Sequence, residues 1–296
     1  MLEEFKNAFN RPNQAHVQLI IINVVVFLFL GVLFVFFRIF SLEPIFTLVH
    51  DQFSIPPKFS DFLTRPWTII TYAFMHDLVS IFHILFNMLA LYWFGRLFVE
   101  YLGSDKLIAL YVLGALAAGV CYLLVFNTVP FFKSQSDFSG MVGASGAIFA
   151  IMVGAATLMP NYTFFLLFFG PIKIKYIAAF YIVSSFLSTV QGNAGGNIAH
   201  LGGALMGFVY IKQLQAGVNW GGWITSVLDW VKGLFSSRPR VKVSYRKSET
   251  SNGKRNVNLS GISQQEIDDI LDKISDGGYE SLSKEEKEKL FKASKK

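Results

Sequence analysis

The sequence predicts an all-α polytopic membrane protein, a bundle of six transmembrane helices followed by a small helical C-terminal tail. The 296 residues are 53% hydrophobic and 16% charged, whereas soluble domains carry about 25% charged residues. The mean hydropathy is +0.45. The shortage of charge is local, because five uncharged windows approach or exceed the roughly 20 residues that a bilayer-spanning helix needs. These windows are 19–37, 78–95, 107–132, 138–172 and 176–211.

Turn signals divide the two longest windows. Pro160-Asn161 ends one helix, and the TFFLLFFG stretch that follows is too short to span, so we interpret it as an interfacial hairpin before Pro171. The glycine-rich QGNAGGN stretch at 191–197 is interpreted as the turn between the last two helices. Six helices are therefore expected, at about 17–38, 78–96, 106–128, 143–159, 174–190 and 197–214.

The distribution of Lys and Arg predicts how these helices are oriented. Basic residues are denser in the N-terminus, in every second loop and in the tail, and such segments face the cytoplasm. We expect both termini in the cytoplasm and, as location, a bacterial inner membrane. No small-residue cleavage site accompanies the first apolar run, so a cleavable signal peptide is not expected. The second, fourth and sixth helices then begin at the outer face.

Five segments are expected along the chain. They are a cytoplasmic N-terminus (1–16), the six-helix core (17–214), an interfacial amphipathic helix (215–235), a basic polar linker (236–261) and a helical hairpin tail (262–296). In the tail, SQQE (263–266) and SKEE (283–286) each match a capping box. Its role stays open between solubility and docking to a partner.

The net charge of +6 does not indicate nucleic-acid binding. Of the 26 Lys and Arg residues, 16 lie at or beyond Lys212. We interpret them as a cytoplasmic tail that faces an anionic leaflet. The expected partner of the tail is therefore the lipid bilayer, and no nucleic-acid partner is expected.

Polar side chains gather near the starts of the second, fourth and sixth helices. His83 and Asn87 are four residues apart on one face of the second helix, and Ser145 opens the fourth. Asn197 and His200 lie in the first turns of the sixth. All are within roughly 5–15 Å of the outer ends of their helices. Polar groups in membrane helices are costly, so this shared depth predicts a functional site.

Small residues at intervals of four predict close contact between the fourth and sixth helices. The two stripes are Gly146, Ala150 and Gly154, and Ala199, Gly203 and Gly207. Such stripes let membrane helices approach backbone to backbone. Ser145 and His200 each lie one residue from their stripe, so we expect the hydroxyl to come within hydrogen-bond reach of the imidazole.

A serine hydroxyl becomes a nucleophile when an adjacent base, usually histidine, takes its proton. Asn and His side chains and free backbone N–H groups can stabilise the oxyanion that follows. No Asp or Glu lies inside a predicted span, so the residues predict a Ser–His dyad without a third, carboxylate member. No HExxH motif is present, and we expect no metal site and no cofactor.

Together, HILFN (83–87), GASGA (143–147) and AHLGGALMG (199–207) resemble the rhomboid family of intramembrane serine proteases. That family's pattern is H-x-x-x-N, G-x-S-G and H-x-x-G-x-x-x-G on the even-numbered helices, and the resemblance covers 17–214. It implies a rhomboid bundle with Ser145 as nucleophile and His200 as general base. His83, Asn87 and Ser145 would line the oxyanion hole, and the supporting residues would be Gly143, Gly146, Asn197, Gly203, Gly207 and Phe149.

Two positions depart from the family pattern. Family members commonly have arginine after the tryptophan of the first loop, whereas Trp67 is followed here by Thr68 and the nearest arginine, Arg65, precedes it. Many relatives have tyrosine four residues after the serine, where this chain has Phe149. A phenylalanine ring can still stack on His200, but it lacks the hydroxyl.

The expected function is hydrolysis of a peptide bond in or near the outer end of another protein's transmembrane helix. Water would enter an outward-facing cavity among the second, fourth, fifth and sixth helices, with the fifth helix and the QGNAGGN turn as gate and cap. The alternative is a catalytically silent rhomboid-like protein that binds transmembrane helices without cleavage. A transporter ranks third, because the sequence has no internal repeat.

Overall fold

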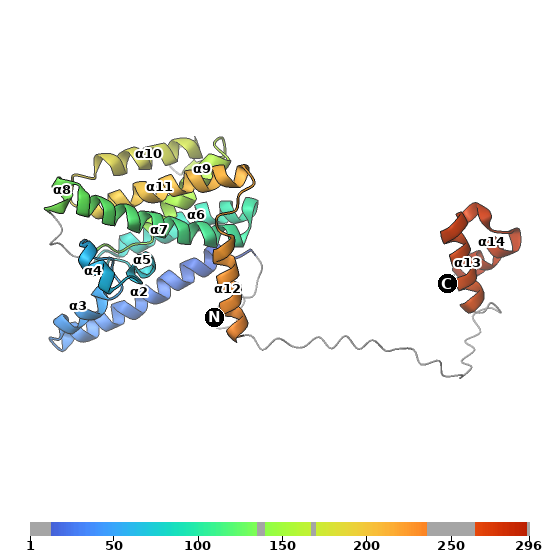
Figure 1. The fold of residues 1–296 in the computed structure, drawn as a ribbon, viewed down its shortest axis with the longest axis horizontal. Coiled ribbons are helices and arrows are strands. Elements are labelled where there is room, and N and C mark those ends of the chain that lie inside the picture. The colour runs from blue at the N-terminus through green and yellow to red at the C-terminus, as the bar shows by residue number, and fades with distance from the viewer. Residues whose placement is uncertain (1–12, 135–139, 167–169, 236–263, 295–296) are drawn as a thin grey trace. The chain divides into compact units, whose positions relative to one another are not determined.

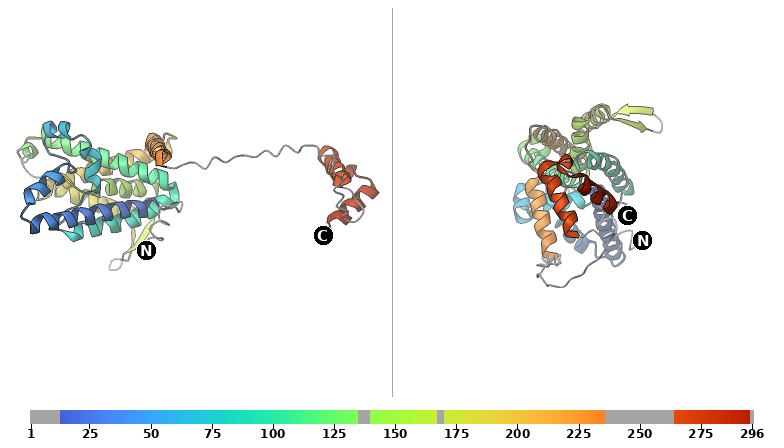
Figure 2. Two further views of the ribbon diagram at one scale, coloured as in Figure 1. Left: turned by 90° about the horizontal axis from the view of Figure 1, so that it is seen from below. Right: turned by 90° about the vertical axis from the view of Figure 1, so that its right-hand side faces the viewer.

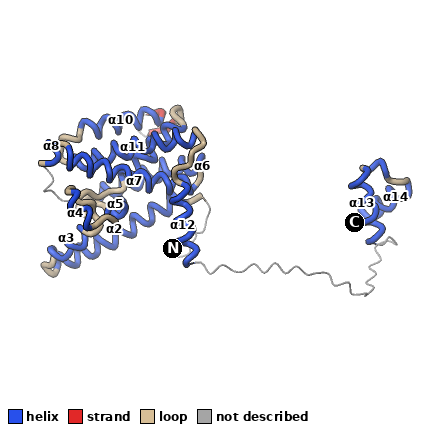
Figure 3. Tube along the Cα trace, in the orientation of Figure 1, coloured by secondary structure: helices blue, strands red, loops and turns tan. Residues whose placement is uncertain are grey.

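The computed structural model describes residues 13–134, 140–166, 170–235 and 264–294, and these are almost entirely helical (Figures 1 and 3). The chain divides into two compact units, Met1–Arg238 and Pro239–Lys296. The predicted N-terminal segment up to residue 12 and the predicted linker at 236–261 lie outside the described residues. The predicted all-α class is confirmed.

The first unit contains a helix at each of the six predicted places. Their bounds are α2 (Ala15–Ile39), α6 (Ile81–Leu102), α7 (Ser104–Thr128), α9 (Ser145–Leu158), α10 (Ile174–Leu187) and α11 (Ala194–Gln215). Of the described helices, α2, α6 and α7 are long and apolar enough to cross a membrane. A further short helix, α8 (Pro130–Lys133), follows α7.

The helices α9 and α10 are shorter than predicted, with 14 residues each. At about 1.5 Å per residue, 14 residues reach roughly 21 Å, less than the roughly 30 Å of a bilayer's hydrocarbon core. α9 starts at Ser145 rather than 143 because Gly143 has φ +139°, which is not helical. Residues 146–156 of α9 are all buried, so this helix occupies the centre of the bundle.

The helix α11 begins three residues earlier than predicted, so Gly195 and Gly196 of QGNAGGN lie in its first turn, while residues 191–193 form the turn before it. The Asn193 side chain caps the helix by accepting a hydrogen bond from the Gly196 N–H at 3.2 Å. A Cβ atom at Gly195 would lie 2.9 Å from the Tyr122 ring. Close packing against α7 therefore favours glycine in this first turn.

The predicted contact between the small-residue stripes is present. A Cβ atom at Gly203 would overlap the carbonyl oxygen of Gly146, and one at Gly207 would overlap that of Ala150. On another side of α9, a Cβ atom at Gly146 would lie 2.6 Å from the Cβ atom of Ala118 on α7. Backbone-to-backbone contact thus fixes α9 against α11.

The segment between α2 and α6 folds into short helices that the sequence analysis did not predict. They are α3 (Glu43–Asp51), α4 (Phe59–Thr64), α5 (Thr68–Thr71) and the 3₁₀ turn η1 (Tyr72–Phe74). Ile55 and Met141 exchange two backbone hydrogen bonds, of 3.1 and 2.9 Å, which join this segment to the residues before α9. The Tyr111 hydroxyl on α7 also donates to the Ala73 carbonyl at 2.7 Å.

The departure at Thr68 has a local structural explanation. Thr68 is fully buried, and its hydroxyl donates to the Arg65 carbonyl at 2.6 Å. The Arg65 guanidinium donates to the Asp51 carbonyl, and the Trp67 indole donates to the Gln52 carbonyl at 2.7 Å. Arg65 and Trp67 together thus hold the loop against the end of α3.

The hairpin predicted after Pro160 is a two-stranded antiparallel sheet. β1 (Thr163–Leu166) pairs with β2 (Gly170–Lys173), Thr163 lying opposite Lys173, and Figure 2 shows the hairpin projecting from the helices. The predicted amphipathic helix is α12 (Gly222–Phe235). Its side chains Trp223, Val227 and Trp230 are exposed.

The second unit is the predicted helical hairpin. It consists of α13 (Gln264–Gly277), η2 (Tyr279–Ser281) and α14 (Lys284–Ser294). Ser283 and Glu286 form the predicted capping box, because the Ser283 N–H donates to the Glu286 carboxylate at 2.8 Å and the Glu286 N–H donates to the Ser283 hydroxyl at 3.3 Å. Ser263, the first residue of the other predicted box, lies outside the described residues.

Candidate active site

Ser145 and His200 lie within hydrogen-bond distance of each other. The Oγ atom of Ser145, the first residue of α9, is 2.8 Å from Nε2 of His200, which lies in the second turn of α11. The Gly203–Gly146 contact lies beside this pair and sets the separation of the two helices. The distance therefore follows from backbone packing and does not require either side chain to reach across a gap.

The second ring nitrogen of His200 contacts a residue that the sequence analysis missed. Nδ1 is 3.0 Å from the hydroxyl of Ser185 on α10, and Ser185 is only 5% exposed. The sequence offered one signal, since Ile174, Ala178 and Ser185 follow one helical face. The neighbouring Ser184 gave an equally polar choice, so the pattern alone did not single out Ser185.

The face of the His200 ring is covered by Phe149. The two rings are stacked, with centroids 4.1 Å apart and an angle of 6° between their planes. The ring of Tyr181 on α10 packs edge-on against Phe149, with ring centroids 6.1 Å apart. The stacking anticipated for Phe149 is thus present, and the imidazole has neighbours at both nitrogens and on one face.

Gly143 leaves open space between Ser145 and His83. Its φ of +139° is strained for any residue with a side chain, and its N–H donates to the Tyr72 carbonyl at 3.0 Å. A Cβ atom at Gly143 would lie 3.5 Å from both the Ser145 Oγ and the His83 Nε2. A side chain there would therefore occupy the space beside the hydroxyl.

His83 and Asn87 bring hydrogen-bond donors to this side of the site. The Asp77 N–H donates to Nδ1 of His83 at 3.4 Å, so a neutral His83 ring carries its proton on Nε2, the nitrogen nearer Gly143. Asn87 is buried one turn further along α6, and within the described part of the chain its Nδ2 has no hydrogen-bond partner. His83 thus presents a donor on the Gly143 side of the site, and Asn87 holds a second, buried donor one turn away on the same helix.

Asn197 does not join the group around Ser145. Its side-chain amide donates to the Ser188 carbonyl at 2.9 Å and so ties the end of α10 to α11. Gly146, Gly203 and Gly207 act through helix packing. Within the described residues no cluster of three or more His, Cys, Asp or Glu side chains is arranged to hold a metal ion.

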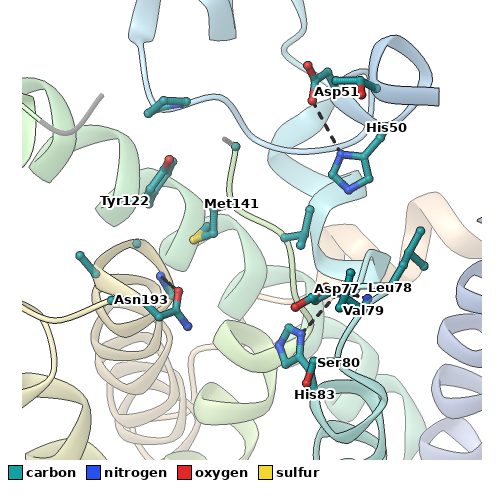
Figure 4. Close-up of a pocket in the computed structure, with 18 of the residues that line it drawn as sticks. His50, Asp51, Asp77, Leu78, Val79, Ser80, His83, Tyr122, Met141 and Asn193 are labelled. Atoms are coloured by element: carbon teal, nitrogen blue, oxygen red, sulfur yellow. Dashed lines mark hydrogen bonds and ion pairs between the residues drawn. The ribbon is translucent and has the colours of Figure 1, made fainter. Parts of the chain in front are cut away.

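A cavity of about 1080 Å³ reaches the site at His83 (Figure 4). Its lining includes Phe34 of α2, residues of α3 and α7, Pro57, residues 77–80 with His83, and residues 140–142 and 191–196. The lining thus includes His83 of α6 and residues 194–196 of α11 but no residue of α9 or α10, and the outward-facing cavity expected among the second, fourth, fifth and sixth helices stays a prediction. The segment before α6 and the loop segment containing α3 line this cavity as well.

Family models match two parts of the chain. The model described as "Rhomboid domain" matches residues 63–215, more than half of the chain, and "Family of unknown function (DUF6576)" matches residues 261–296. The second match covers the helical hairpin, which is thereby separate from the rhomboid domain.

Curated relatives carry the same family name. RHOMBOID-like protein 12, mitochondrial, of Arabidopsis thaliana is 36% identical over 163 residues, which cover 52% of this chain and 48% of the relative. Rhomboid protein 1, mitochondrial, of Saccharomyces cerevisiae is 30% identical over 159 residues, covering 51% and 42%. Rhomboid protease GlpG of Salmonella newport is 36% identical over 88 residues, covering 29% and 26%.

The match to the two mitochondrial proteins spans about half the length of each. The rhomboid match begins in the first loop and ends at the last residue of α11, so it includes the segments that carry His83, Ser145 and His200. Together with the apolar helices, these matches identify a multi-pass membrane protein that belongs to the rhomboid family.

Proposed function

We propose that this protein is an intramembrane serine endopeptidase in which Ser145 is the nucleophile and His200 the general base. The observation that carries the proposal is the 2.8 Å distance between Ser145 Oγ and His200 Nε2. A serine hydroxyl in contact with an imidazole is the arrangement that nucleophilic catalysis requires. One group of relatives is named rhomboid protease GlpG, and this name supports peptide-bond hydrolysis as the proposed reaction.

In the first step, Ser145 Oγ attacks the carbonyl carbon of the scissile peptide bond while its proton passes to His200 Nε2. Collapse of the tetrahedral intermediate breaks the C–N bond, and the imidazolium returns the proton to the departing amine. The product is an acyl-enzyme ester at Ser145. Water then attacks this ester by the same route, with His200 again taking a proton, and the free serine is restored.

The oxyanion formed in each step needs hydrogen-bond donors placed in advance. We assign this role to the Ser145 N–H at the start of α9, to the His83 Nε2–H and to the Asn87 amide. The open space at Gly143 supports this assignment because the substrate carbonyl can enter there. The Asn87 Nδ2, which has no partner among the described residues, supports it as well.

The proposed substrates are transmembrane segments of other proteins. α9 is about 9 Å shorter than the hydrocarbon thickness, which favours a position of Ser145 below the membrane surface. Carbonyl groups of an intact helix already accept hydrogen bonds, so the substrate must unwind locally before Ser145 can attack. The cavity at His83 supplies a route for water.

The proposed orientation has both ends of the chain in the cytoplasm and the site near the opposite face. The excess of basic residues in the N-terminus, alternate loops and tail supports it. We further propose that α12 lies in the membrane interface through its exposed Trp223, Val227 and Trp230. A bacterial inner membrane is our proposed location, and fluorescent fusions test it against the mitochondrial membrane that the names of two relatives suggest.

Cleavage of a reporter tests the proposed activity. The purified full chain is incubated in liposomes with a transmembrane reporter that contains a small residue followed by helix-weakening residues. We expect cleavage that Ser145→Ala and His200→Ala each reduce by at least about a thousandfold. Ser184→Ala, which changes a serine of α10 that has no place in the proposed mechanism, should leave the rate within twofold.

Failure of the unaltered protein to cleave a panel of such reporters would contradict the proposal. The alternative would then hold, in which the bundle binds transmembrane helices without cutting them. Retention of full activity in Ser145→Ala would equally contradict the assignment of the nucleophile.

A further inference from the structure

The helix α10 places a hydroxyl against the imidazole that the proposed reaction uses. Its buried residues are Ile174, Ala178 and Ser185, which share one helical face. Most of its other side chains are exposed, among them Phe180, Val183 and Phe186. Ser185 is therefore the polar member of an otherwise apolar stripe, and its hydroxyl meets His200 Nδ1 at 3.0 Å.

We propose that Ser185 is a positioning residue for His200. Its Oγ accepts the Nδ1–H, which fixes the tautomer and the ring orientation in which the bare Nε2 faces the Ser145 hydroxyl. This inference rests on the proposed function, because it assigns Ser185 a part in the same reaction. Ser185 acts only through His200 and has no contact with the scissile bond.

A neutral imidazole has one N–H group and one bare nitrogen. Nε2 can take the proton of Ser145 only when the ring hydrogen is on Nδ1. A hydrogen on Nδ1 needs an acceptor at this buried place, and Ser185 Oγ is at the required distance. The contacts of His200 with Ser185 and Ser145 then have complementary directions, one donated by the ring and one accepted by it.

The same contact stabilises the ring after proton transfer. When Nε2 takes the Ser145 proton, both ring nitrogens carry hydrogen, and the Nδ1–H bond to Ser185 becomes stronger because its donor is charged. Ser185 keeps its own proton throughout, and no covalent bond to it forms or breaks. It thus occupies the place that a carboxylate has in a Ser–His–Asp triad.

A neutral hydroxyl should contribute much less than a carboxylate. Removing the correct tautomer in a triad lowers kcat about 10⁴-fold, whereas the gain of one hydrogen bond to a neutral hydroxyl when its donor becomes charged corresponds to about tenfold. α10 contains no Asp or Glu that could take over the role. The expected effect is therefore measurable but far smaller than the loss of His200 itself.

Steady-state cleavage by the full chain in liposomes tests this inference. We expect Ser185→Ala to lower kcat about tenfold with KM within twofold, because the substrate does not touch Ser185. Ser185→Thr keeps a hydroxyl and should recover most of the rate, while Ser184→Ala on the same helix should behave like the unaltered protein. A role in packing alone predicts the opposite order, with alanine tolerated better than the larger threonine.

Nitrogen-15 NMR of histidine-labelled protein in detergent provides a readout that does not depend on turnover. The chemical shift separates protonated from bare ring nitrogens, and His200→Gln assigns the signal among the five histidines. We expect the Nδ1–H form in the unaltered protein and a shift toward the Nε2–H form in Ser185→Ala. Ser184→Ala should leave the signal unchanged.

The possible outcomes separate this inference from the proposed function. If the unaltered protein cleaves, Ser145→Ala does not, and Ser185→Ala matches the unaltered protein in kcat and in tautomer, the role of Ser185 is overturned while the protease proposal stands. If the unaltered protein neither cleaves nor reacts with a fluorophosphonate, both fail. A tenfold loss in Ser185→Ala with an unchanged tautomer also overturns the positioning role.

Discussion

The bundle of α2–α11 and the hairpin of α13 and α14 are both helical, but different interactions hold them. In the bundle, glycines bring α9 and α11 into backbone contact, and the described residues of α9 between 146 and 156 are all buried. In the hairpin, exposed ion pairs join the helices, with Lys273 2.6 Å from Glu286 and Lys289 3.0 Å from Glu266.

This difference follows from the surroundings of each unit. Lipid supplies no hydrophobic force between apolar helices, so close packing of small residues provides their contact. Water screens exposed ion pairs, which therefore contribute little each. A site that requires fixed distances belongs in the first unit, where steric contact sets the separation of Ser145 and His200. Substitutions that add bulk should therefore destabilise the bundle most. Changes of pH or salt should instead destabilise the hairpin.

The largest effect is expected from Gly203→Val. The new side chain would overlap the Gly146 carbonyl and should destabilise the bundle by about 3 kcal/mol through overpacking. That corresponds to a fall of roughly 6–12 °C in the melting temperature of the detergent-solubilised protein. Cleavage should be lost as α9 and α11 separate.

Gly31→Val is the matched control, because Gly31 of α2 has open space where its Cβ would lie. The two variants are compared by thermal unfolding and by cleavage rate. An equal loss of stability in both would show that valine itself, rather than the α9–α11 contact, causes the change.

Gly143→Ala should reduce stability less than Gly203→Val does, but it should reduce the cleavage rate strongly. Alanine is strained at φ +139° by about 1–3 kcal/mol, and relief of that strain would move the backbone next to Ser145. We expect cleavage to fall at least about a hundredfold, the size of losing one oxyanion donor.

Gly170→Ala serves as its control, because Gly170 has φ +70° in the hairpin of β1 and β2, outside the group around Ser145. It should lose comparable stability and keep its cleavage rate. Parallel losses of activity in both variants would contradict a specific role for the backbone at Gly143.

The smallest effect is expected in the helical hairpin on acidification. Hydrogen bonds from Lys273 and from Ser283 lower the pKa of Glu286 to about 2. Because the folded-state pKa lies below the ordinary value, the carboxylate's contribution is present above about pH 4.5 and is lost as the pH falls toward 2. Amide exchange of α14 in the full chain should therefore accelerate between pH 5 and pH 2.5, beyond the intrinsic dependence of exchange on pH.

Glu286→Gln should remove most of this pH dependence, and 1 M salt should reduce it. Exchange in α9 should be unaffected by either change. A response of α9 as large as that of α14 would contradict the contrast between the two units.

The sequence predicted the parts of the bundle that depend on regular spacing. The lack of charge located all six helices, and stripes at intervals of four correctly predicted which faces of α9 and α11 meet. The capping box at 283–286 was also predicted correctly, because its two residues interact within one turn of the chain. Local and periodic signals can be read without knowing which helices become neighbours.

The features that the sequence left open depend on tertiary contacts. Ser185 was not distinguishable from Ser184, because only the packing of α10 decides which hydroxyl faces His200. The helices of the first loop are short, and contacts such as the Ile55–Met141 pairing hold that segment in place. The same segment lines part of the cavity that reaches His83, which the sequence did not predict.

The most direct test of the central claim is the reaction of Ser145 with a fluorophosphonate, which reports an activated serine without any choice of substrate. We predict covalent labelling at Ser145, located by mass spectrometry, with none in Ser145→Ala and a labelling rate at least about a hundredfold lower in His200→Ala. Labelling of other serines alone, or equal rates in the unaltered protein and His200→Ala, would contradict the claim that His200 activates Ser145.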